Sequence, residues 1–171
     1  PEDLNLGNGV YHVTRNTGNL VDHSRFQYWS ATVDTATMGH VFAGANPNDF
    51  YQYTPSASPS WQLKAGNQIM TPGRGYATTP TVNSSAQNFN ENRTFSGQVN
   101  NGAVTYSESA AANDFMLVGN PYPSPISSTA FIDANPNLFG ALYFWNHSTP
   151  VSAFNGNGNN TNQDYAIWNY T

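Results

Sequence analysis

Turn-forming residues interrupt this chain at short intervals, and their spacing limits its fold more than any other feature. The 171 residues include 14 Gly and 11 Pro, two residue types that disfavour the interior of helices and of central strands. Between them lie short runs rich in aromatic and β-branched residues, which are typical of β-strands. These runs predict strands over residues 9–14, 26–33, 41–42, 50–53, 68–70, 75–79, 93–99, 103–107, 114–118, 141–145 and 164–170.

Many short strands spaced about 8–12 residues apart favour two stacked antiparallel sheets. We therefore predict an all-β fold, an antiparallel β-sandwich of jelly-roll type, formed as a single domain by residues 1–171. At most one short helix is expected, over residues 128–135. Ser127 or Ser128 can cap its start, and Pro136 follows its end.

The clearest local pattern is a β-hairpin over residues 94–106. Two runs of alternating bulky and polar residues flank Asn101-Gly102, a pair that tolerates the positive φ angles of a tight hairpin turn. Gly97 interrupts the first run at a position where a bulge is expected.

The composition excludes several classes of protein. Only 9% of the residues are charged, well below the roughly 25% of an average soluble domain. Aromatic residues make up 14% of the chain, which is too many for a disordered segment. The five Lys and Arg residues are too few to neutralise a row of phosphates, so nucleic acid is not an expected partner. No run approaches the roughly 20 apolar residues of a spanning helix, so membrane insertion is not expected.

Recognisable catalytic and metal-binding patterns are missing from the sequence. The chain has no Cys, which removes disulfides, thiolate metal ligands and cysteine nucleophiles. The acidic residues single out no carboxylate pair of the kind that a glycosidase needs. We expect no catalytic residue and no required cofactor, and a glycoside hydrolase with an unrecognised carboxylate pair is the least favoured alternative. The histidines show no metal-ligand spacing; they are His12, His23, His40 and His147.

Two segments invite a calcium interpretation. Residues 133–137 (Asp-Ala-Asn-Pro-Asn) place oxygen donors at alternate positions, as calcium loops do. An EF-hand would require Gly at Leu138 and Glu at Phe144, so that pattern fails. The Asn-rich run 155–164 offers one carboxylate, Asp164. A structural calcium ion is one interpretation of these segments, and ordinary Asn/Asp turn chemistry is the other.

The run Pro72-Gly-Arg-Gly-Tyr76 is Gly-rich but lacks the Lys-Ser/Thr of a phosphate-binding loop. We interpret it as a turn that leads into a strand. Arg74 is then expected to pair with a carboxylate on a neighbouring strand.

A series of motifs in a fixed order carries a resemblance to a known group of proteins. The most specific is the run of residues 117–126, Leu-Val-Gly-Asn-Pro-Tyr-Pro-Ser-Pro-Ile. The others are Tyr28-Trp-Ser30 with Val33, Phe50-Tyr-Gln-Tyr53 with Trp61, Met70-Thr-Pro-Gly-Arg-Gly-Tyr76, Phe95-Ser-Gly97 with Asn100-Asn-Gly102, and Leu142-Tyr-Phe-Trp145. Over about residues 26–170 the chain resembles a β-rich module of secreted and cell-surface proteins of Bacteroidetes bacteria, which are often exported by the type IX secretion system.

The resemblance implies an extracellular setting, either secreted or at the cell surface. It implies a module within an adhesin or a multidomain polysaccharide-degrading enzyme, covalently linked to neighbouring domains, and it brings no catalytic motif. Because the chain starts at Pro1 without a signal-peptide pattern, we expect it to be a fragment of such a larger protein. The Gly-Asn-Pro-Tyr-Pro-Ser run is interpreted as a rigid corner between sheets, with a ligand-facing loop as the alternative.

Aromatic residues provide the candidate binding site. Sugar rings stack their C–H faces on Trp and Tyr, while Asn, Asp, Gln and His bond the hydroxyl groups, and a few aromatic anchors supply most of the affinity. In residues 142–145 the strand period separates Leu142 and Phe144 from Tyr143 and Trp145, so one pair is expected to be buried and the other exposed. The competing interpretation is that these aromatics fill the core. The ligand-binding candidates are Trp61, Tyr143, Trp145, His147, Asp164 and Trp168.

The net charge of −5 argues against an anionic polysaccharide, which would bind better to a basic surface. We therefore expect a non-catalytic carbohydrate-binding or adhesive module for a polysaccharide or cell-surface glycan, more consistent with a neutral one. The alternative is a structural spacer that has the same fold and no ligand. Exposed coplanar aromatics in a groove favour binding, and a fully buried aromatic set favours the spacer.

Overall fold

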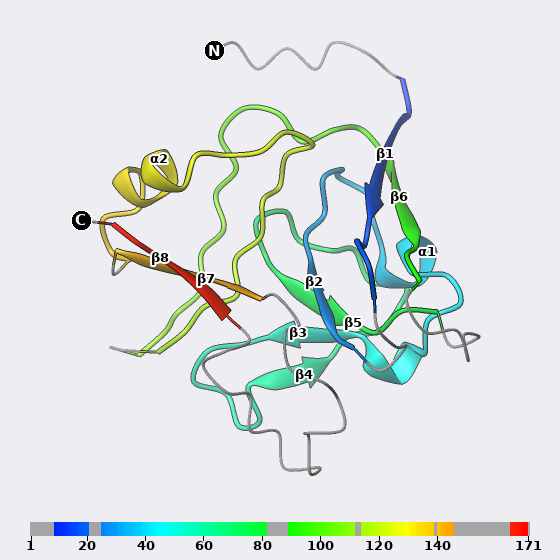
Figure 1. The fold of residues 1–171 in the computed structure, drawn as a ribbon, viewed down its shortest axis with the longest axis horizontal. Coiled ribbons are helices and arrows are strands. Elements are labelled where there is room, and N and C mark those ends of the chain that lie inside the picture. The colour runs from blue at the N-terminus through cyan, green and yellow to red at the C-terminus, as the bar shows by residue number, and fades with distance from the viewer. Residues whose placement is uncertain are drawn as a thin grey trace. The chain divides into compact units, whose positions relative to one another are not determined.

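A computed structural model describes residues 9–20, 25–81, 89–111, 114–138, 140–145 and 165–170. The chain divides into two compact units, residues 1–124 and residues 125–171. The described residues form mainly antiparallel strands with small helices (Figure 1), which confirms the predicted all-β, sandwich-like architecture. The prediction of a single domain stays a prediction.

The first unit contains two antiparallel sheets. A two-stranded sheet joins β1 (Tyr11–Asn16) to β6 (Asn92–Gly97). The second sheet has the strand order β2-β5-β3-β4. Its members are β2 (Gln27–Trp29), β5 (Tyr76–Thr78), β3 (Tyr51–Tyr53) and β4 (Trp61–Leu63).

The core of this unit is shared by the two sheets. Phe95 of β6 is buried in the same cluster as Tyr76 of β5. The ring of Phe42 joins the two sides, because its centroid lies 6.3 Å from that of Phe95 and 5.2 Å from that of Trp29 on β2. Burying aromatic rings of this size is the largest favourable contribution that such a small unit can make to its folding.

Helical segments are short but more numerous than predicted. α1 (Met38–Val41) and η1 (Pro47–Asp49) lie in the first unit, and α2 (Ser128–Asp133) in the second. α2 falls inside the predicted helix, with the Ser127 hydroxyl accepting from the N–H of Ala130. The prediction of at most one short helix was wrong, because α1 and η1 also form. Residues 41–42, predicted as a strand, belong instead to the end of α1 and the turn after it.

The predicted hairpin over residues 94–106 was also wrong. β6 pairs with the distant β1, from Tyr11↔Gly97 to Asn16↔Asn92, and residues 103–107 form no strand. Gly102 has φ +68°, but Asn101 does not adopt the positive φ that a two-residue turn of this kind needs. The expected strands at 68–70 and 114–118 are likewise reduced to single bridges, Thr37↔Ile69 and Arg74↔Val118.

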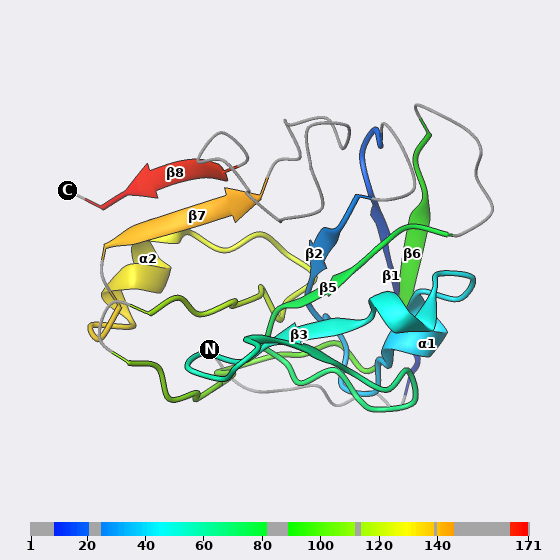
Figure 2. The same ribbon diagram turned by 90° about the horizontal axis from the view of Figure 1, so that it is seen from below.

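The second unit is a β-hairpin with α2. β7 (Ala141–Trp145) and β8 (Tyr165–Asn169) pair antiparallel, from Ala141↔Asn169 to Trp145↔Tyr165, as Figure 2 shows. The Tyr170 hydroxyl donates to Asp133 Oδ1 at 2.7 Å, which ties the end of the hairpin to the end of α2.

Candidate functional site

One face of the four-stranded sheet carries a cluster of aromatic side chains. Side chains alternate along a strand, so Tyr28 points away from the core into which its neighbour Trp29 packs. The register extends this face from Tyr28 through Ala77 and Tyr51 to Leu63. We call this surface the outer aromatic face; it consists of Tyr28, Tyr51, Tyr53, Trp61 and Leu63, with Ala77 at its centre.

Trp61 contacts the rings of two tyrosines, Tyr28 and Tyr53. Its centroid is 5.7 Å from that of Tyr28, with an interplanar angle of 38°, and 5.2 Å from that of Tyr53, with an angle of 75°. Tyr53 is the cross-strand partner of Trp61. Such pairs stabilise the sheet and also hold the rings in a defined arrangement.

The rings lean over the sheet instead of standing away from it. Tyr28 and Trp61 come from β2 and β4, the two edge strands, and still touch across the strands between them. Ala77 is only 2% exposed although it belongs to this face, which is expected if larger side chains cover it. Trp61 is 36% exposed and Leu63 is 63% exposed, so part of this apolar surface faces solvent.

An arginine fixes the backbone where β3 ends beside Trp61. Arg74 Nη2 donates to the carbonyl of Tyr53 and to the hydroxyl of Thr54, both at 2.9 Å, and to Glu108 Oε1 at 2.8 Å. Arg74 therefore has the expected carboxylate partner, but Glu108 lies outside any strand, so its expected place on a neighbouring strand was wrong. Burial, followed by the hydrogen bond that its hydroxyl donates to Glu108, raises the pKa of Tyr106 well above the ordinary tyrosine value.

The loop over residues 54–60, which joins β3 to β4, is held from another side. Ser56 has φ +58°, and both its N–H and its hydroxyl donate to Asp114 Oδ2 at 2.9 Å. The hydroxyl bond from Ser56 and the N–H of Phe115 lower the pKa of the Asp114 carboxyl, because they stabilise its charged form. Both Asp114 and Arg74 therefore hold the segment that leads from Tyr53 to Trp61.

The Gly-Asn-Pro-Tyr-Pro-Ser motif uses its polar groups inside the chain. Asn120 accepts from the N–H of Tyr122 and donates to the carbonyl of Ser124. The Tyr122 hydroxyl donates to the Gly102 carbonyl at 2.6 Å and accepts from the Val104 N–H at 3.3 Å. These bonds link the motif to residues 102–104; its interpretation as a corner between sheets stays a prediction.

Of the predicted binding residues, Trp61 lies on the outer aromatic face. Sequence reasoning missed its partners Tyr28 and Tyr53. The alternation of Tyr51, Gln52 and Tyr53 indicated that two tyrosines share a face, but nothing in the sequence showed that β2 would bring Tyr28 to Trp61. His147 and Asp164 lie outside the described residues.

The remaining candidates lie on the hairpin of the second unit, on opposite faces. Tyr143 and Trp145 share one face with Tyr165, whose ring centroid lies 5.1 Å from that of Trp145. Trp168 pairs with Leu142 on the other face and contacts the ring of Tyr170 at 6.0 Å. The structure therefore separates Trp168 from Tyr143 and Trp145.

The expected split of this hairpin into a buried and an exposed pair was wrong. Tyr143 is 48% exposed and Phe144 is 50% exposed, although they point to opposite faces, while Leu142 and Trp145 are half-buried. Among the described residues of this unit, one short helix accompanies the hairpin, and these elements alone do not bury a whole face.

The carboxylates that the structure describes are engaged in local hydrogen bonds. Each accepts from a different neighbouring group, and no group of three or more metal-ligating side chains occurs among the described residues. Asp133, from the segment with the calcium interpretation, accepts from Tyr170. The full set is Asp34, Asp49, Glu91, Glu108, Asp114 and Asp133.

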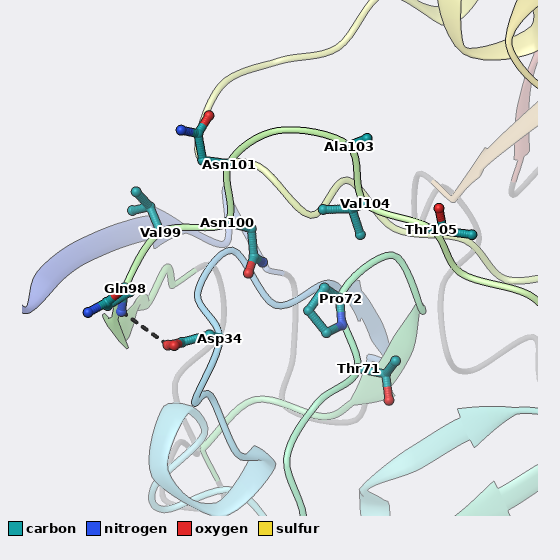
Figure 3. Close-up of a pocket in the computed structure, with 10 residues that line it drawn as sticks. All are labelled: Asp34, Thr71, Pro72, Gln98, Val99, Asn100, Asn101, Ala103, Val104 and Thr105. Atoms are coloured by element: carbon teal, nitrogen blue, oxygen red, sulfur yellow. Dashed lines mark hydrogen bonds between the residues drawn. The ribbon is translucent and has the colours of Figure 1, made fainter. Parts of the chain in front are cut away.

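A separate hollow of about 560 Å³ lies in the first unit (Figure 3). Asp34 is its charged lining residue, and Asp34 Oδ1 accepts from the N–H of Gln98 at 3.1 Å. Amide and hydroxyl side chains, Asn100, Asn101 and Thr71 among them, line the rest together with small apolar groups. This hollow could not be predicted from the sequence, because its walls come from three distant segments.

Comparison with known proteins identifies the family. A family model described as a domain of unknown function (DUF8693) matches residues 2–171. The chain belongs to this family. No curated protein and no solved structure matches the DUF8693 chain. Within the described residues, no helix has the length and apolar character needed to cross a membrane. The resemblance to secreted Bacteroidetes modules stays a prediction.

Proposed function

We propose that this chain is a non-catalytic, extracellular module that binds carbohydrate through its outer aromatic face. The observation that carries the proposal is the contact of Trp61 with the rings of Tyr28 and Tyr53 on a partly exposed sheet face. Aromatic rings remove the C–H faces of sugars from water, and a small number of such anchors accounts for most of the affinity in comparable interfaces. The rings are tilted to one another, so they differ from the coplanar pair in a groove that the sequence analysis named as the feature that favours binding.

The charges near this face suit a neutral glycan. The chain has a net charge of −5, and Arg74, the cation that bonds the end of β3, is neutralised by Glu108. Lys64 follows β4, and burial, with a smaller contribution from Arg74, lowers its pKa. A uronate-rich or sulfated polysaccharide would gain little electrostatic attraction from such a surface.

The engaged carboxylates support a binding role over a hydrolytic one. A glycosidase needs two carboxyl groups that face each other across the scissile bond. Glu91 and Glu108, the two described glutamates, are instead paired with Arg93 and Arg74. In a secreted or cell-surface protein, such as an adhesin or a polysaccharide-degrading enzyme, this module would hold its neighbouring domains at a glycan and raise their local concentration.

The test is retention of the 171-residue chain on a panel of polysaccharides. We expect retention on at least one neutral glycan, and Trp61→Ala should abolish it while the circular dichroism spectrum stays unchanged. Tyr11→Ala is the matched control, because Tyr11 is an exposed aromatic on β1, outside the outer aromatic face. Trp145→Ala asks whether the hairpin takes part. A chain that binds none of the glycans contradicts the proposal and leaves the spacer.

A further inference from the structure

We infer that the outer aromatic face binds a single, hydrated polysaccharide chain along its length, rather than the packed surface of a crystalline polysaccharide. This inference rests on the proposed carbohydrate-binding function and specifies the physical form of the ligand. It depends on the orientation and spacing of three rings, which belong to Tyr28, Trp61 and Tyr53.

The orientation of the rings decides between the two forms. A crystalline polysaccharide presents a flat surface, which can stack on several rings only if those rings share a plane. Trp61 is inclined to Tyr28 by 38° and to Tyr53 by 75°. A flat surface stacked on Trp61 therefore meets Tyr53 nearly edge-on. An individual chain can rotate about its glycosidic bonds, so successive sugars can follow the change in ring orientation.

The contacts between the rings join them into one apolar surface. Trp61 contacts both Tyr28 and Tyr53, with centroid separations of 5.7 Å and 5.2 Å. Tyr28 comes from edge strand β2 and Trp61 from edge strand β4, while Tyr53 comes from β3, which lies between them in the sheet order, so the three rings form a cluster around Trp61. A sugar on Trp61 thus has neighbours within reach of Tyr28 and Tyr53, and affinity should grow as a ligand gains the residues that contact them.

The backbone that leads from Tyr53 towards Trp61 is held in place before any ligand arrives. Arg74 bonds the carbonyl of Tyr53 and the hydroxyl of Thr54, and Asp114 bonds Ser56 in the following loop. A movement of the backbone that brought Tyr53 and Trp61 into one plane would have to shift this part of the β3–β4 hairpin against both Arg74 and Asp114. Preorganisation of this kind favours the ligand that matches the existing geometry.

The experiment compares two physical forms of the same polymer. Depletion isotherms of the full chain are measured on cellulose, chitin and mannan, each in a swollen amorphous and a crystalline form, with soluble starch and galactomannan added to the panel. We expect tighter binding to an amorphous or soluble form, and a loss of about tenfold or more in Trp61→Ala. Tyr28→Ala and Tyr53→Ala should each lose several-fold, whereas Tyr11→Ala should match the wild type.

Calorimetric titration with oligosaccharides of a polymer that binds the chain tests whether more than one of the three rings contacts the ligand. Affinity should rise from the monosaccharide to the trisaccharide, and Tyr53→Ala should reduce that rise. Preferential binding to a crystalline form, lost in Trp61→Ala, overturns the single-chain inference and leaves the glycan-binding function intact. Equal affinity for mono- and trisaccharide also overturns the inference, because one ring would then suffice. Binding to no polymer overturns the proposed function as well.

Discussion

Replacing Tyr122 with Phe tests whether the Gly-Asn-Pro-Tyr-Pro-Ser motif is a structural corner. The substitution removes a single oxygen, which donates to the Gly102 carbonyl at 2.6 Å and accepts from the Val104 N–H at 3.3 Å. The first bond has good geometry and is worth about 1 kcal/mol net, and the second exceeds the usual N–H···O range and is worth less. Gly102 and Val104 are half-buried, so water can replace part of what is lost. We expect the free energy of unfolding to fall by about 1–2 kcal/mol.

Urea unfolding followed by tryptophan fluorescence measures this change, and the slope of the transition should stay constant. Tyr11→Phe is the matched control, because Tyr11 is exposed on β1; its change should remain within about 0.5 kcal/mol. A loss of less than about 0.5 kcal/mol in Tyr122→Phe would show that the hydroxyl bonds do not support residues 102–104. Weaker glycan binding at unchanged stability would instead identify a ligand-facing loop.

Three other perturbations address the contacts around the sheet. Glu108→Ala leaves its arginine partner uncompensated; because the two side chains are 16% and 13% exposed, we expect a loss of about 2–3 kcal/mol in urea unfolding, somewhat below that for a fully buried pair. Gly119→Ala would place a Cβ 2.3 Å from the Cβ of Ser30, and should cost about 1–3 kcal/mol in the same assay. Folding lowers the pKa of Asp114, so its charged carboxylate stabilises the folded loop above the unfolded pKa, and this stabilisation is lost as pH falls through the folded pKa. Proteolysis of the 54–60 loop should therefore increase in acid for the wild type, but not for Asp114→Asn.

Local sequence patterns predicted the β-rich fold class correctly, and they failed where distant segments compete for a partner. The Asn101-Gly102 signal favours a hairpin between neighbouring runs, yet β6 pairs with β1 from the other end of the unit. That pairing brings Val13 against the cluster in which Phe95 is buried. Residues 103–107 keep the alternation of half-buried and exposed side chains. However, the N–H of Val104 donates to the Tyr122 hydroxyl and not to a neighbouring strand.

The candidate site was predictable only in part, because local patterns do not show which distant strands become neighbours. Trp61 could be named from its residue type and the adjacent Pro/Ser-rich loop. The order β2-β5-β3-β4 is not encoded by any local period, so the meeting of Tyr28 with Trp61 required the structure. α1 was missed because four residues are too few to show a helical period, and the cap by Thr37 was its main signal.

The aromatic residues of the first unit fall into two sets with different physical consequences. The rings of Phe42, Phe50 and Phe95 are buried, and they account for the stability that a spacer would need. Rings on the outer face contribute less burial, and exposed apolar surface of this kind favours unwanted association. In a spacer, Trp61 would contribute only its contacts with Tyr28 and Tyr53 to the stability of the sheet. A glycan-binding module gains its principal anchor there, so the placement of this ring favours binding over spacing.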